Sequence, residues 1–269
     1  MSFQEMTFHS DGTRLSALTR PGRGPTLVLM PGAMSDAAGW LPMATLLSEE
    51  RPLAVLNRRG RHPSGPMGES YTVRTEIDDL HALIAELDTE IDLFGWSYGG
   101  LIASEVATGS KAVRSLMAYE PVAAPFGAAA IPGLQEAVGR GDLDRAVELV
   151  NLQVSEFTEE HVAGLRRTTA WPVLRPLAAP VAKELAAINN FQPHWQRYTA
   201  LDIPVTLLVG ERNQRTGPYG VAFHRFVDAM PQARMVILRD QGHLAHAEAP
   251  HVLAAALNNV LNTRSSASA

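Results

Sequence analysis

The 269-residue chain contains no cysteine, which excludes a disulfide framework, a thiolate nucleophile and a cysteine metal site. It also has no apolar run of the roughly 18 residues that a membrane-spanning helix needs. Its opening residues, Met-Ser-Phe-Gln-Glu-Met-Thr-Phe, lack both the basic part and the apolar part of a signal peptide. The sequence therefore predicts a cytoplasmic protein without a membrane partner.

Positive charge is also scarce. Lysine occurs only twice, and 23 basic residues stand against 28 acidic ones, which gives a formal net charge of −5. This balance argues against nucleic acid as the main partner. The short basic cluster Arg58, Arg59 and Arg61 does not change that expectation. We expect these three side chains to be exposed surface charge, with binding of a substrate carboxylate as the alternative.

Apolar residues make up 46% of the chain, and they fall into strand-like and helix-like segments that alternate. Asp11-Gly12 between the first two strand-like segments is a hairpin signal. Alternation with short connections predicts crossover units, and hence an α/β fold with a mostly parallel central sheet flanked by helices. The expected strands are residues 3–8, 14–19, 26–30, 53–56, 91–95, 113–119, 205–209 and 235–238, and the expected helices are 36–48, 73–87, 101–108, 217–229 and 247–261.

The alternation stops between residues 121 and 198, where helical segments are broken by prolines. We expect this segment to be a helical insertion into a core domain formed by residues 1–120 and 199–269. The small, polar tail 263–269 is expected to be disordered. The insertion contains five phenylalanine and tryptophan residues. For any one of them we expect a place in the insertion's own core, and lining of an apolar pocket is the alternative. They are Phe126, Phe157, Trp171, Phe191 and Trp195.

Ser97 lies at the centre of Gly95-Trp-Ser-Tyr-Gly99, between a predicted strand and a predicted helix. A Gly-x-Ser-x-Gly in this context is typical of a strained turn that presents a serine hydroxyl at its tip. An ordinary glycine turn with a surface serine is the alternative. The context favours a nucleophilic serine at position 97.

A serine hydroxyl needs a base that takes its proton. His243 follows the strand 235–238 and precedes the last helix, so it lies at the carboxyl end of a strand, where sites form in parallel sheets. Ser97 lies at the carboxyl end of another strand. We therefore expect His243 to be the base. His246 is the rival, and we expect it to be a solvated residue in the first turn of a helix.

These segments resemble the α/β-hydrolase superfamily over nearly the full length of the chain. The resemblance rests on residues 95–100, on Gly242-His243 followed by Glu248 and Pro250, and on residues 57–64, which are similar to the family's loop after strand four. It implies an α/β-hydrolase fold, with Ser97 as nucleophile and His243 as base. It also implies that the helical insertion is a lid inserted after strand six that covers the pocket.

An oxyanion hole requires two backbone N–H groups directed at the developing negative charge. One is expected from Tyr98, the residue after the nucleophile. The other is expected from Ala33, with Met34 as a fallback, in the loop Met30-Pro-Gly-Ala-Met34. The family usually has His-Gly where this chain has Pro31-Gly32, and a plain turn is the alternative.

The third member of such a triad is a carboxylate that orients the histidine. The family's common position for it, after strand seven, corresponds here to Asn213. The second position used in the superfamily is the end of strand six, where this chain has Glu120. We predict Glu120 as the acid, with Glu211 or Asp240 as alternatives, and a neutral Asn213 or no acid as the remaining possibility.

A serine nucleophile favours acyl transfer, because attack on carbon would leave an ether that does not turn over. We therefore expect hydrolysis of a small apolar carboxylic ester, lactone or thioester through an acyl-serine. No metal or organic cofactor is implied, and the expected partner is a small-molecule acyl substrate. Two alternatives stay open: a cofactor-free perhydrolase or carbon–carbon bond hydrolase with the same triad, and a ligand-binding protein with little catalysis.

Overall fold

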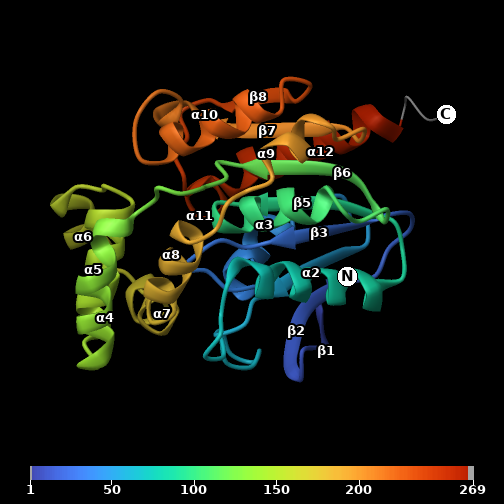
Figure 1. The fold of residues 1–269 in the computed structure, drawn as a ribbon. Coiled ribbons are helices and arrows are strands. Elements are labelled where there is room, and N and C mark those ends of the chain that lie inside the picture. The colour runs from blue at the N-terminus through green and yellow to red at the C-terminus, as the bar shows by residue number, and fades with distance from the viewer. Residues whose placement is uncertain (1, 266–269) are drawn as a thin grey trace.

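The computed structural model describes residues 2–265, which form an eight-stranded sheet with helices on both faces (Figure 1). The strand order is β1-β2-β4-β3-β5-β6-β7-β8. β1 pairs with β2 and β2 with β4 in antiparallel fashion, and all other neighbours are parallel. The predicted mostly parallel α/β sheet is confirmed. The strands are β1 Gln4–Ser10, β2 Thr13–Arg20, β3 Thr26–Met30, β4 Leu53–Asn57, β5 Ile91–Trp96, β6 Val113–Tyr119, β7 Val205–Gly210 and β8 Arg234–Leu238.

The central strands are apolar on both sides because helices cover both faces of the sheet. In β3, Leu27 and Leu29 face one apolar cluster, and Val28 and Met30 face the other, as the two-residue period of a strand requires. One face is covered by α2 (Val73–Leu87), α3 (Tyr98–Ala107) and α10 (Tyr219–Ala229), and the other by α1 (Leu41–Ala44), α11 (Ala245–Glu248) and α12 (Pro250–Ser265).

Two predicted helices differ from the observed ones. The expected helix 36–48 is reduced to the 3-10 turn η1 (Ala38–Trp40) and α1. The expected last helix is divided at Ala249, whose φ of −143° and ψ of 59° are not helical. The following proline disfavours helical geometry at Ala249 and then starts α12. Residues 263–265, expected in a disordered tail, complete α12, and residues 266–269 lie outside the described part.

The segment between β6 and β7 is helical, as predicted, and lies beyond the end of the sheet from which β6 leaves (Figure 1). We call residues 121–198 the helical insertion. Its elements are η2 Ala128–Ala130, α4 Ile131–Gly139, α5 Leu143–Leu149, the short π-helix η3 Val150–Val154, α6 Glu159–Leu165, α7 Ala170–Ala178, α8 Val181–Asn189 and the start of α9 Trp195–Thr199.

The arginines that follow β4 are not surface charge. Arg58, Arg59 and Arg61 are 1%, 4% and 1% exposed, so the expectation of exposed side chains is wrong. The reason is that each has a buried carboxylate partner within the chain. Arg59 makes two hydrogen bonds of 2.6 Å to Asp79 of α2, a paired geometry in which arginine binds carboxylates well.

Arg58 and Arg61 join the core to the helical insertion. Arg58 Nη2 lies 2.7 Å from Glu76 of α2 and 2.7 Å from Glu184 of α8, and Arg61 Nη1 lies 2.6 Å from Glu184. Burial opposes the charge on Glu184, but Arg58 and Arg61 more than offset it and lower the pKa of that carboxyl. Arg58 Nη1 also donates to the carbonyl of Gly32 at 2.8 Å. This buried ion cluster fixes α8 over the core.

Candidate active site

Ser97 occupies a sharp turn between β5 and α3. Its φ of 57° and ψ of −123° lie in a region that few residues other than glycine adopt, and such strain is concentrated at functional sites. The turn is held by hydrogen bonds from Ser97 N to Tyr119 O and from Gly100 N to Ser97 O, both 2.9 Å. A Cβ at Gly99 would lie 2.1 Å from the Met30 carbonyl oxygen, so only glycine lets α3 begin this close to β3.

His243 lies in the loop between β8 and α11 and is 3% exposed. Its Nδ1 is 2.6 Å from Glu120 Oε2, and its carbonyl accepts a 2.9 Å hydrogen bond from Trp96 Nε1. A carboxylate at Nδ1 favours the tautomer with the proton on that nitrogen, which leaves Nε2 as the acceptor. The structure thus brings together the histidine and the acid that the sequence predicts.

Glu120 follows β6 directly, has a φ of 43° and is fully buried. Its Oε1 accepts a 2.8 Å hydrogen bond from the backbone N–H of Gly210, and its Oε2 accepts one of 2.9 Å from Asn213 Nδ2. Both carboxylate oxygens therefore accept hydrogen bonds at fixed positions. Asn213, at the position where the resemblance would place an acid, contacts the same oxygen of Glu120 that His243 contacts.

The two alternative acids are placed elsewhere. Glu211 Oε2 accepts a 2.9 Å hydrogen bond from the backbone N–H of Asp240, and both residues are exposed. The carboxylate that contacts His243 is that of Glu120.

Burial lowers the pKa of His243, although the hydrogen bond and the charge of Glu120 act in the opposite direction. The imidazole is therefore neutral near pH 7, the state in which Nε2 can accept a proton.

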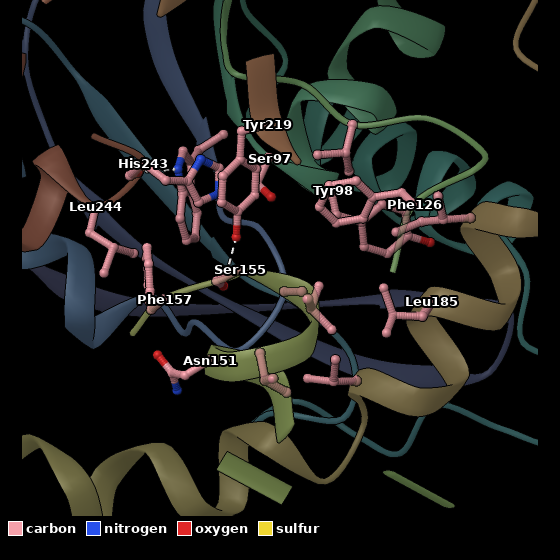
Figure 2. Close-up of a pocket in the computed structure, with 17 residues that line it drawn as sticks. Ser97, Tyr98, Phe126, Asn151, Ser155, Phe157, Leu185, Tyr219, His243 and Leu244 are labelled. Atoms are coloured by element: carbon pink, nitrogen blue, oxygen red, sulfur yellow. Dashed lines mark hydrogen bonds between the residues drawn. The ribbon is translucent and has the colours of Figure 1, made fainter. Parts of the chain in front are cut away.

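Ser97 and His243 line one cavity with a free volume of about 60 Å³, and Figure 2 shows both side chains at its wall. No hydrogen bond joins the Ser97 hydroxyl to the His243 ring among the described residues. Such bonds are often long in enzymes without substrate. The two groups are thus brought to the same side of the same cavity.

The residues expected to form the oxyanion hole also line this cavity. Tyr98 is the first residue of α3, so its N–H belongs to those that have no acceptor within the helix. Ala33 follows Gly32, at which a Cβ would lie 2.8 Å from the Ser97 Cβ. This close approach brings the loop that carries Ala33 next to the turn of Ser97.

The aromatic residues of the insertion divide into two groups. Phe126 and Phe157 line the cavity, whereas Trp171, Phe191 and Trp195 do not. Trp171 instead donates a 2.6 Å hydrogen bond from Nε1 to Asp144. Phe126 also belongs to the buried apolar core, so a place in the cavity wall does not contradict the expected core role.

The expectation that His246 is a solvated residue is wrong, because two indole rings cover its side chain. It is 7% exposed and stacks on Trp40 with ring centroids 4.5 Å apart and an interplanar angle of 3°, and Trp96 lies 4.3 Å away. Burial and the nearby His243 lower its pKa to about 3. His246 is a neutral packing residue beside the site.

Tyr219 is a part of the site that the sequence analysis missed. Its ring stacks on the ring of His243 with centroids 3.4 Å apart and an interplanar angle of 11°. Its hydroxyl lies 2.8 Å from the hydroxyl of Ser155 in the helical insertion (Figure 2). No pattern signals this contact, because α10 and the loop after β8 meet only in the folded chain.

Within residues 2–265, no group of three or more histidine, aspartate and glutamate side chains is arranged to hold a metal ion. In the same part of the chain, no helix combines the length and apolar composition needed to cross a bilayer.

The model of the alpha/beta hydrolase family matches residues 27–256. A Bacillus subtilis (strain 168) protein provisionally named 2-succinyl-6-hydroxy-2,4-cyclohexadiene-1-carboxylate synthase is 22% identical over 94% of this chain and 97% of its own length. A pimeloyl-[acyl-carrier protein] methyl ester esterase of Neisseria meningitidis is 28% identical over 74% of this chain and 79% of its own. The structure of an alpha/beta hydrolase from Sphaerobacter thermophilus is 26% identical, with a TM-score of 0.81, over 94% of this chain and 99% of its own.

Proposed function

Because this chain belongs to the alpha/beta hydrolase family, we propose that it is a serine hydrolase that cleaves a small apolar carboxylic ester, lactone or thioester through an acyl-serine intermediate. The observation that carries the proposal is the 2.6 Å contact between His243 Nδ1 and Glu120 Oε2, beside a cavity that Ser97 and His243 both line. The 28% identity to a protein of Neisseria meningitidis that is named an esterase supports this reaction class.

In the proposed reaction, Ser97 Oγ attacks the substrate carbonyl carbon while His243 Nε2 takes the hydroxyl proton. Glu120 stabilises the resulting imidazolium through Nδ1. The N–H groups of Ala33 and Tyr98 donate to the oxyanion, and each donor of this kind lowers the barrier by about 3 kcal/mol. The carbon–oxygen or carbon–sulfur bond then breaks, and the leaving group receives the proton from His243. Water repeats the sequence on the acyl-serine and releases the acid.

The first test uses a fluorophosphonate, which phosphonylates an activated serine whatever the natural substrate. We expect the wild-type protein to be labelled at Ser97, as located by mass spectrometry, and to hydrolyse p-nitrophenyl acetate and butyrate. Ser97→Ala is expected to lose both properties. Ser110→Ala, which removes a hydroxyl outside the cavity, is expected to keep them.

A protein that is neither labelled nor active on these esters would contradict the proposal and favour a ligand-binding role. Hydrolysis that persists in Ser97→Ala would contradict the assignment of the nucleophile.

A further inference from the structure

Asn151, in η3 of the helical insertion, is a polar side chain in an apolar part of the cavity. It is 3% exposed and lines the cavity together with Val150 and Val154. Its Nδ2 donates a 2.8 Å hydrogen bond to the carbonyl oxygen of Val147. A carbonyl accepts only from a donor, so this bond fixes which end of the amide is nitrogen.

The amide oxygen of Asn151 therefore points the other way, and Figure 2 shows the oxygen and the nitrogen on opposite sides of the side chain. No described residue donates to this oxygen, and it is not among the polar atoms that are packed out of reach of solvent. Because Asn151 lines the cavity, an amide oxygen without a partner in the described part of the chain is available to a ligand there. Buried polar groups of folded proteins are otherwise almost always hydrogen-bonded.

A second polar group lines the same cavity. The hydroxyls of Ser155 and Tyr219 are 2.8 Å apart, so one donates to the other and one hydroxyl proton stays free. The 17 residues that line the cavity include no aspartate, glutamate, lysine or arginine. The cavity wall thus offers one neutral acceptor, from Asn151, and one neutral donor, from the Ser155–Tyr219 pair, and no residue with a formal charge.

We propose that the cavity selects acyl substrates that carry a neutral hydroxyl group on the part that reaches the helical insertion, with Asn151 Oδ1 as the acceptor of its proton. A hydroxyl is favoured over an ammonium because no carboxylate faces the cavity. It is favoured over bulkier neutral donors because the free volume is only about 60 Å³. The inference rests on the proposed function for the acyl part of the substrate, and on Asn151 for the hydroxyl.

The expected preference for hydroxylated substrates follows from what the Asn151 amide oxygen contacts in each complex. An apolar chain bound against Asn151 leaves the buried oxygen without a hydrogen bond, whereas a hydroxyl restores it. Sites built to bind a hydroxyl discriminate strongly against analogues that lack it. Asn151 is therefore a residue that determines specificity.

Binding to the Ser97→Ala variant tests the inference without requiring catalysis. The probes are methyl butanoate with methyl 3-hydroxybutanoate, and methyl hexanoate with methyl 6-hydroxyhexanoate, measured by isothermal titration calorimetry. We expect at least one hydroxylated ester to bind at least about threefold more tightly than its parent, as one net hydrogen bond allows. Neither ester doing so would overturn the inference.

Variants of Asn151 give the second arm. In Ser97→Ala combined with Asn151→Leu, the preference for the hydroxylated ester is expected to disappear, because leucine has a similar size and no acceptor. Asn151→Ala is expected to have the same effect, which guards against a loss specific to the leucine variant. Gln153→Leu, on the exposed side of the same segment, is expected to keep the preference. A preference that survives both Asn151 variants would overturn the inference.

The two proposals fail separately. If Ser97 is labelled and simple esters are cleaved, but hydroxylated and parent esters bind equally, only the inference about Asn151 is wrong. If the hydroxylated ester binds better through Asn151 but Ser97 is not labelled, the binding site stands and the proposed hydrolase activity is wrong.

Discussion

Glu120 and Asn213 stand at the two positions that the α/β-hydrolase superfamily uses for the acid, and the predicted one, Glu120, carries the carboxylate. Glu120 supplies the carboxylate from the end of β6, and Asn213 donates to the same oxygen that contacts His243. The amide thereby helps to orient the carboxylate instead of replacing it. Asn213 therefore acts on the imidazole only through Glu120, whereas Glu120 contacts it directly.

Glu120→Gln is expected to lower kcat/KM by about 10⁴-fold, because an amide at this position permits the wrong tautomer of His243. Asn213→Ala removes one hydrogen bond to Glu120 and is expected to have little effect. Asn213→Asp places a second carboxylate where the amide lies 2.9 Å from Glu120 Oε2, so it is expected to lower kcat/KM more than Asn213→Ala does. The measurement is kcat/KM for p-nitrophenyl butyrate at pH 7.5 or above.

Nearly full activity in Glu120→Gln would show that another group orients His243. A larger loss in Asn213→Ala than in Asn213→Asp would show that the amide acts in some way other than through Glu120.

The pH dependence of activity follows from His243. Because burial lowers its pKa in the folded protein, the acidic limb of the kcat/KM profile is expected to have its midpoint below the ordinary histidine value of about 6.5. As pH falls through that midpoint, Nε2 becomes protonated and cannot accept the proton of Ser97. The charge of Glu120 raises this pKa, so in Glu120→Gln the midpoint of the residual activity is expected at a still lower pH. A midpoint at or above 6.5 in the wild-type protein would contradict the assignment.

At the residue scale, the sequence predicts groups whose role imposes a local pattern. Ser97 is marked by its flanking glycines, and His243 and Glu120 by their places after strands. Tyr219 and Asn151 carry no such mark, since Tyr219 contacts the distant His243, and Asn151 is identified only by the cavity that it lines. The three arginines after β4 were misjudged because their carboxylate partners are distant in the chain.

Among the elements, α8 is joined to the core by buried ion pairs. Glu184 of α8 lies between Arg58 and Arg61, and all three side chains are fully buried. A pair of this kind adds little net stability compared with apolar packing, but the loss of one partner leaves a buried charge without compensation.

Glu184→Gln is therefore expected to lower the free energy of unfolding by about 3 kcal/mol, because Arg61 loses its carboxylate partner. The measurement is the midpoint of urea denaturation at constant m-value. Glu136→Gln is the control, since Glu136 pairs with Arg140 on the exposed surface of α4 and its loss is expected to cost less than about 0.5 kcal/mol. Equal effects of the two substitutions would show that the buried cluster does not hold α8.

The sequence predicts long, periodic elements well and short ones poorly. The helix 73–87 has its predicted bounds because a strong apolar period coincides with a capping box at Thr72. The segment 36–48 has apolar spacing typical of a helix, but Gly39 and Pro42 lie within it, and packing against α12 and the sheet decides its shape.

In the molecule as a whole, the helical insertion meets the core domain over the cavity. Phe126, Val181 and Leu185 come from the insertion, while Ser97 and His243 come from loops at the end of the sheet (Figure 2). The free space left between them, about 60 Å³, is small compared with pockets for larger ligands. The alternating pattern predicts the insertion, and the family resemblance implies its place over the pocket, but the volume depends on side-chain packing that neither encodes.

The small cavity predicts a preference for short acyl chains. Along a series of p-nitrophenyl esters from acetate to octanoate, kcat/KM is expected to be highest at two to four acyl carbons and to fall by roughly tenfold or more at eight, because a longer chain must displace packed side chains. Leu185→Ala, which enlarges the cavity, is expected to move the optimum to longer chains at a cost of about 2–5 kcal/mol in stability. A rate that rises steadily to octanoate in the wild-type protein would contradict this prediction.

The guanidinium of Arg58 has one further consequence for the molecule. The same group that pairs with Glu184 of α8 also donates to the carbonyl of Gly32, the residue immediately before the N–H expected to stabilise the oxyanion. Any movement of α8 away from the core separates the Glu184 carboxylate from the Arg58 guanidinium. Arg58 then keeps its contacts with Glu76 and the Gly32 carbonyl. One buried cation therefore contacts both the helix that covers the pocket and the loop expected to bind the oxyanion. A displacement of α8 that admits substrate is thus coupled through Arg58 to the position of that loop.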